Sequence, residues 1–188
     1  MKKNILIIIV ILAITAAGIW IYSFQSGKKA PVAESQGTVL AKEDFSILAP
    51  DGWEQVQNSS LPAVVVYAGE EITETAAKNA NFKTYYSVNH DTIGSSTIDD
   101  YAEYIRQGLN RIFKDVKLNK EAAIELNGQQ ARSIEMEIKR GEVDLKVLTL
   151  LVSGNKDDIW IVSFNATKNN WEKYQELFQE IALSFEIK

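Results

Sequence analysis

Two apolar stretches, VLTLLV (147–152) and IWIVSF (159–164), decide the fold of this 188-residue chain. Both are rich in the branched and aromatic residues typical of strands, and both are apolar at odd and even positions alike. Because the side chains of a strand point alternately to its two faces, such strands are stable only where both faces of the sheet are covered. The two stretches therefore predict strands at the buried centre of a layered domain.

The residues around these stretches predict an antiparallel meander over residues 122–164. In the preceding strand Ile134, Met136 and Ile138 alternate with charged residues, so one of its faces meets water. Turn signals separate the strands at Asn127-Gly128, Arg140-Gly141 and Ser153-Gly154-Asn155. Further strands are predicted at 45–50, 63–69 and 82–89, with a loop or short surface helix at 70–81.

Two amphipathic helices flank the meander in sequence. In TIDDYAEYIRQGLNRIFKD (97–115) an apolar stripe recurs at three- and four-residue steps, and Thr97 with Asp100 resembles a capping box. In NNWEKYQELFQEIALSF (169–185) the stripe contains Trp171 and Phe178. Helices on opposite faces of the sheet would cover its two-sided strands. We therefore expect an α+β fold, an α/β/α sandwich around a central antiparallel sheet.

The N-terminus predicts a membrane anchor over residues 1–24. Two lysines precede an uncharged run whose last 20 residues, Ile5 to Phe24, would span about 30 Å as a helix. Trp20, Tyr22 and Phe24 fall at its far end, where aromatic side chains favour the membrane interface. The prediction is a single-pass signal-anchor in the cell membrane, with the domain on the extracytoplasmic side.

A cleaved signal peptide is the alternative, because small residues follow the first apolar residues at 15–18. The protein would then be secreted, and the domain is exported in either case. Residues 25–40 are polar with small residues and one proline, which is typical of a flexible linker. The globular domain is predicted at 41–188.

The composition of this domain excludes several functions. Residues 41–188 contain 16 Lys plus Arg and 24 Asp plus Glu, a net charge of −8, and no basic stripe. Nucleic-acid binding needs a positive surface, so no nucleic-acid partner is expected. The absence of cysteine excludes disulfides, thiolate chemistry and cysteine-type zinc sites.

The element order and one signature resemble a known family. FSILAPDGWEQV (45–56), with Gly52-Trp53 after a strand, is similar to the opening of PsbP-like domains. A strand, a short loop and a TIDDYAEYI helix follow, then a meander with an Asn-Gly hairpin and a closing helix headed by tryptophan. The similarity covers residues 43–187. The chain resembles a bacterial membrane-anchored member, without a thylakoid transit sequence.

The resemblance implies a fold and a kind of activity. The family is named for a photosystem II subunit that helps retain calcium and chloride, and its fold occurs in a Ran-binding import factor and in bacterial envelope proteins. It implies a binding or assembly module, so we expect a non-enzymatic protein without a cofactor that contacts a protein partner in an envelope complex.

The chain's one histidine, in SVNHDTIGSS (87–96), is the natural place to look for chemistry. His90 stands beside Asp91, but the Gly-x-Ser-x-Gly elbow is absent, and one histidine cannot make a multi-imidazole zinc site. The segment is typical of a strand end and a turn, with Ser96 or Thr97 starting the next helix.

Four residues remain candidates for an interaction site: His90, Asp91, Asp157 and Asp158. An extracytoplasmic small-ligand or calcium-binding protein is the alternative function, in which these acidic residues would contribute oxygen ligands. A hydrolase that uses His90 and Ser96 is the third.

Overall fold

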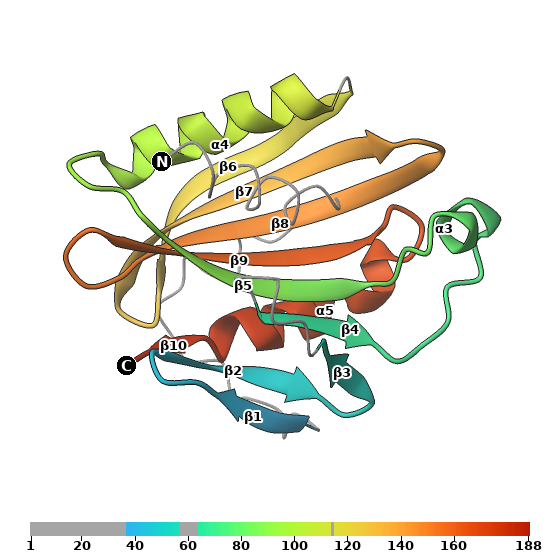
Figure 1. The fold of residues 1–188 in the computed structure, drawn as a ribbon, viewed down its shortest axis with the longest axis horizontal. Coiled ribbons are helices and arrows are strands. Elements are labelled where there is room, and N and C mark those ends of the chain that lie inside the picture. The colour runs from blue at the N-terminus through green and yellow to red at the C-terminus, as the bar shows by residue number, and fades with distance from the viewer. Residues whose placement is uncertain (1–36, 57–63, 114) are drawn as a thin grey trace.

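The two apolar stretches form the centre of a seven-stranded sheet with the order β3-β4-β5-β9-β8-β7-β6 (Figure 1). The computed structural model describes residues 37–56, 64–113 and 115–188. Neighbouring strands in this sheet pair antiparallel throughout. The strands are β3 (Trp53–Gln55), β4 (Val64–Ala68), β5 (Tyr85–Thr92), β6 (Val116–Leu126), β7 (Gln129–Arg140), β8 (Val143–Ser153) and β9 (Asp158–Thr167).

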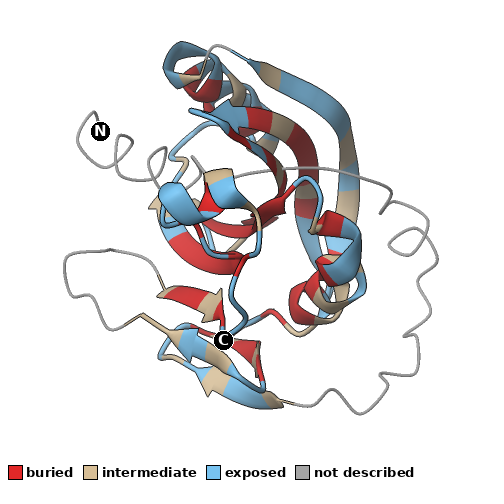
Figure 2. Ribbon diagram, turned by 90° about the vertical axis from the view of Figure 1, so that its right-hand side faces the viewer, coloured by how far each residue is buried: buried red, intermediate tan, exposed pale blue. Residues whose placement is uncertain are grey.

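Strands β8 and β9 are covered on both faces, as their pattern predicts. On β8, Leu148 and Leu150 point into the same core cluster as Phe178 of the last helix. Val147 and Leu151 of the same strand point to the other face, where a second cluster forms. Figure 2 shows the consequence, since the central strands are buried along most of their length.

Three helices are described: α3 (Thr75–Asn79), α4 (Ile98–Ile112) and α5 (Trp171–Leu183). Helices α4 and α5 pack on opposite faces of the large sheet, through Ile105 and Phe178 respectively (Figure 1, Figure 2). The capping box at Thr97 and Asp100 forms, and it fixes the first turn of α4. The predicted α+β fold and its antiparallel sheet are confirmed.

A second, smaller sheet is a feature that the sequence reading missed. It has three strands in the order β1-β2-β10, with β1 (Gly37–Ala41), β2 (Phe45–Pro50) and β10 (Glu186–Ile187). Strand β1 begins before the boundary predicted at Ala41, and β2 pairs with the C-terminal β10 rather than with the large sheet. Phe45 and Ile47 of β2 join the α5-side core. The small sheet therefore completes the layer that α5 begins.

Other boundaries differ from the predicted ones. Strand β5 continues through His90 to Thr92, so His90 lies in a strand and not in a turn. Strand β6 starts at Val116, before the meander predicted from residue 122. Its first half is polar because it is the exposed edge of the sheet, and polarity hides a strand from pattern reading.

The predicted anchor lies outside the described residues, as do Trp20, Tyr22 and Phe24 and the start of the linker at 25–40. Within residues 37–56, 64–113 and 115–188, no helix has the length and apolar character needed to cross a membrane.

Hydrogen bonds fasten the two sheets and α5 together. Tyr86 Oη of β5 donates to the Leu48 carbonyl of β2 at 2.9 Å, and the Leu48 amide donates to Ser184 Oγ at 2.8 Å. Asn127 Nδ2, in the β6–β7 turn, donates to the Leu183 and Phe185 carbonyls at 2.9 and 2.8 Å. These bonds satisfy carbonyls at the end of α5 that the helix itself leaves free.

Phe178 tests how strongly this layer holds the fold. It is fully buried, and its ring contacts the rings of Phe164 and Trp171 at centroid distances of 5.2 and 5.3 Å. We expect Phe178→Ala to lower the free energy of unfolding by about 3–5 kcal/mol, because it removes apolar burial and leaves a cavity. Leu183→Ala, in the same helix but 41% exposed, is the control and should change it by less than about 1 kcal/mol. Urea unfolding measures both, and equal losses would contradict this packing.

An ion pair on β7 gives the domain a specific response to acid. Lys168 Nζ donates to Glu137 Oε2 at 2.7 Å, and Asn119 Nδ2 donates to Glu137 Oε1 at 3.1 Å. The hydrogen bond from Lys168 lowers the pKa of Glu137 below its usual value of 4.5, against the opposing effect of partial burial. A lowered pKa stabilises the fold above about pH 4.5, and this contribution is lost as pH falls through the folded-state pKa.

We therefore expect Glu137→Gln to lose up to about 1 kcal/mol of stability at neutral pH, since the pair is partly exposed. The variant and the parent should converge in stability as pH falls below 4.5. Glu142→Gln is the control, because Glu142 is exposed and has no ion pair among the described residues. Urea unfolding between pH 3 and 7 tests this; a pH-independent gap would mean that Glu137 acts through packing instead.

Candidate functional site

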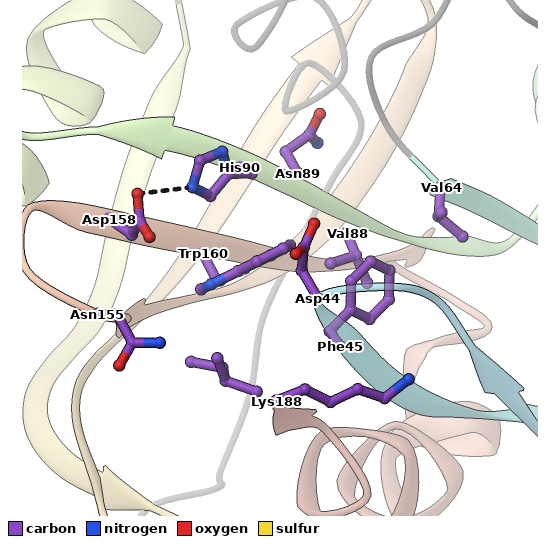
Figure 3. A pocket seen from close by; sticks show the side chains of 11 residues that line it. Asp44, Phe45, Val64, Val88, Asn89, His90, Asn155, Asp158, Trp160 and Lys188 are labelled. Atoms are coloured by element: carbon purple, nitrogen blue, oxygen red, sulfur yellow. Dashed lines mark ion pairs between the residues drawn. The ribbon is translucent and has the colours of Figure 1, made fainter.

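The two sheets meet at a cleft of about 350 Å³ (Figure 3). Its walls come from the start of β2, the end of β5, the start of β9 and the C-terminal residues of the chain. The lining combines an apolar floor with charged and polar groups at the rim. His90 and Asp158, two of the four predicted site residues, are part of it.

His90 and Asp158 form the one printed ion pair of the cleft. The antiparallel register places His90 opposite Trp160 and Thr92 opposite Asp158, so His90 and Asp158 are diagonal neighbours on one face of the sheet. His90 Nε2 lies 3.0 Å from Asp158 Oδ1 (Figure 3). Both side chains are accessible to solvent, at 43% and 38% exposed, so the pair stands where a partner can reach it.

Aromatic rings form the floor beneath this pair. The Trp160 ring lies 4.8 Å from the His90 ring and 5.2 Å from the Phe45 ring, measured between centroids. Gly154 permits this arrangement, because a Cβ there would come within 2.9 Å of Asp158 Cβ and 3.1 Å of Trp160 Nε1. The floor is therefore packed from both sheets and is rigid.

The opposite rim carries Asp44 and Lys188. The Lys188 amide donates to the Asp44 carbonyl at 3.0 Å, which ties the end of β10 to the turn before β2. Lys188 Nζ donates to the Lys42 carbonyl, so its charge is directed away from the centre of the cleft (Figure 3). The Asp44 carboxylate has no partner among the described residues, and it faces the floor across from Asp158 (Figure 3).

The structure separates the other two predicted residues from the cleft. Asp91 points to the α4 face, where its Oδ2 accepts a hydrogen bond from Tyr101 Oη at 2.8 Å. Burial, and next the Asp91 charge, raise the pKa of Tyr101, so its hydroxyl remains a donor. Asp157 lies in the β8–β9 turn, and its carbonyl accepts the Ile93 amide at 2.8 Å. Both residues hold loops in place, and neither lines the cleft.

The cleft offers groups for binding more readily than for catalysis. Ser96 lies in the turn before α4, and the described residues give no hydrogen bond between it and His90. Within residues 37–56, 64–113 and 115–188, no group of three or more histidine or acidic side chains could hold a metal ion. The described side chains therefore assemble neither a nucleophile–base pair at His90 nor a calcium cage at the predicted acidic residues.

Sequence reasoning found His90 and Asp158 but missed the residues that make a cleft of them. Phe45, Asp44 and Lys188 come from the ends of the domain, and only the β2–β10 pairing brings them here. Trp160 carried a signal, since it lies two residues after Asp158 and so shares its face of the strand.

A family model and several solved structures match this fold. The PsbP family model matches residues 38–187. No curated protein sequence matches the chain. The solution structure of cyanobacterial PsbP (CyanoP) from Synechocystis sp. PCC 6803 is 18% identical and covers 87% of this chain and 99% of its own, with a TM-score of 0.59.

Two further structures are similar in fold. LpqN, involved in cell envelope biogenesis of Mycobacterium tuberculosis, is 12% identical and covers 81% of this chain and 91% of its own, with a TM-score of 0.57. The Saccharomyces cerevisiae Ran-binding protein Mog1p is 10% identical and covers 81% and 96%, with a TM-score of 0.56. At such identities the structural matches establish the fold alone.

The different positions of His90 and Asp91 lead to different expected costs of removing them. His90→Ala removes one partner of an exposed pair and should change the free energy of unfolding by less than about 1 kcal/mol. Asp91→Ala leaves the mostly buried Tyr101 hydroxyl without its acceptor and should cost about 1–3 kcal/mol. Thermal unfolding of the two variants compares them directly; a larger loss for His90→Ala would assign the structural role to the wrong residue.

Proposed function

The chain belongs to the PsbP family, and on this premise we propose that it is a non-catalytic module that binds a partner protein at the cleft between its two sheets. The observation that carries the proposal is the composition of this cleft. An apolar floor of Phe45 and Trp160 is surrounded by the polar rim of Asp44, His90 and Asp158. An apolar centre with a polar rim is the usual anatomy of a protein-binding surface.

The construction of the cleft also favours binding. Its residues lie on or beside strands β2, β5, β9 and β10, whose backbones are fixed by sheet hydrogen bonds. A site that is already shaped before it meets its partner loses little conformational entropy on binding. The Ran-binding activity named for Mog1p supports protein contact as a use of this fold.

We further propose that the domain works outside the cytoplasm, tethered by residues 1–24, as part of an envelope complex. The apolar run with lysines before it supports this location. The envelope role named for LpqN, a protein of similar fold, is consistent with it. The cleft would then be presented to partners on the outer side of the membrane.

The volume of the cleft favours a small ligand as the second candidate function. About 350 Å³ is within the lower part of the range of small-molecule sites, which begins near roughly 300 Å³. The calcium version of this alternative lacks a ligand cluster among the described residues, so an organic molecule fits the described cleft better.

Site-specific photo-crosslinking in intact cells tests the proposal. Asn155 is exposed at the rim, so a photoreactive residue there should give a protein adduct of defined mass. The matched control places the same residue at Glu125, which is exposed on the edge strand β6 and should give no such adduct.

A second change separates specific docking from chance contact. Asp44→Trp, in an exposed turn, would fill the cleft without touching the core, and it should abolish the Asn155 adduct while leaving expression and melting temperature unchanged. Adducts that form equally at both positions, or that survive Asp44→Trp, would contradict docking in the cleft. Co-purification of a small molecule, displaced by Asp44→Trp, would favour the second candidate.

A further inference from the structure

The charges around the cleft point to a particular kind of partner. We infer that the cleft accepts a cationic side chain, lysine or arginine, carried on an apolar-flanked segment of the partner protein. This inference rests on the proposed function and adds to it the chemistry of the group that is bound.

Two carboxylates from different elements face the same apolar floor. Asp44 lies in the turn before β2, and Asp158 begins β9 (Figure 3). Asp158 uses Oδ1 to contact His90, and its Oδ2 has no partner among the described residues. The Asp44 carboxylate has none there either. Acceptors are therefore available on both sides of the cleft.

The basic groups of the lining do not neutralise these acceptors. Lys188 Nζ donates to the Lys42 carbonyl, and Lys42 Nζ lies 3.4 Å from Gln55 Oε1. His90 is already placed against one oxygen of Asp158. The unmatched charge in the cleft is negative, so a cation would be attracted and an anion repelled.

The floor suits the stem of a lysine or arginine as well as its charge. Such side chains bury their methylene groups along apolar surfaces and keep the charged end at a polar rim. Phe45 and Trp160 supply the apolar surface, and Val64 extends it toward β4. A free metal ion would gain nothing from this floor, whereas an amphipathic side chain uses both parts.

The whole domain supports the same polarity. Residues 41–188 carry 16 basic and 24 acidic side chains, a net charge of −8. A negative surface attracts a basic partner over a distance and raises the rate at which the two meet. The long-range field and the local carboxylates therefore favour the same partner chemistry.

A pair of peptides of equal shape tests the charge requirement. Acetyl-Leu-Arg-Leu-amide is compared with acetyl-Leu-citrulline-Leu-amide, which has the same length without the positive charge. We expect the arginine peptide to shift the indole NMR signal of Trp160 in the full chain and to bind about tenfold more tightly than the citrulline peptide. The preference should weaken as salt is raised, because the rim is open to solvent.

Variants assign the effect to the two carboxylates. Asp44→Asn and Asp158→Asn should each weaken binding of the arginine peptide about three- to tenfold, and Glu125→Gln, on the distant edge strand, should not change it. Equal binding of both peptides, or insensitivity to both aspartate changes, would overturn the inference.

The outcomes for the inference and for the proposed function remain distinguishable. If the Asn155 adduct forms and is lost in Asp44→Trp but survives in the Asp44→Asn, Asp158→Asn double variant, the cleft binds a partner without needing its cation. If no adduct forms at Asn155, docking at the cleft fails, whatever the peptides do.

Discussion

Burial of β8 and β9 on both faces is the constraint on which the rest of the structure depends. Alternate side chains of these strands enter two separate core clusters, so neither face can be left to water. This requirement places α4 on one face, and α5 with the small sheet on the other. Even the polar members of the apolar runs conform, since Thr149 and Ser163 are cross-strand neighbours whose hydroxyls lie 3.3 Å apart in the interior.

The cleft arises where this covering layer ends. Helix α5 shields the middle of its face, and β2 extends the layer toward the ends of β5 and β9. Beyond Phe45 the layer stops, and the ring of Trp160 changes from core to cleft floor. A binding surface thus forms at little structural cost, because its floor is the edge of a core that the fold needs in any case.

The sequence predicts those parts of the fold that local patterns control. Two-sided apolar strands, stripes of helical spacing and turn residues such as Asn127-Gly128 specify β7 to β9, α4 and α5. The small sheet depends instead on Ser46 pairing with Glu186, and no periodicity links such distant residues. The site was half predictable for the same reason: His90 and Asp158 follow from one hairpin register, but Asp44 and Phe45 require the distant pairing.

The arrangement of His90 explains why the cleft suits recognition better than reaction. Its partner Asp158 orients the ring, and Trp160 supports it from below, yet the described residues place no hydroxyl or metal ligand within its reach. A general base without a group to activate adds little to catalysis. The same pair, held on rigid strands beside an unmatched Asp44, gives fixed polarity to an apolar hollow, and fixed polarity is what allows one partner to be chosen over another.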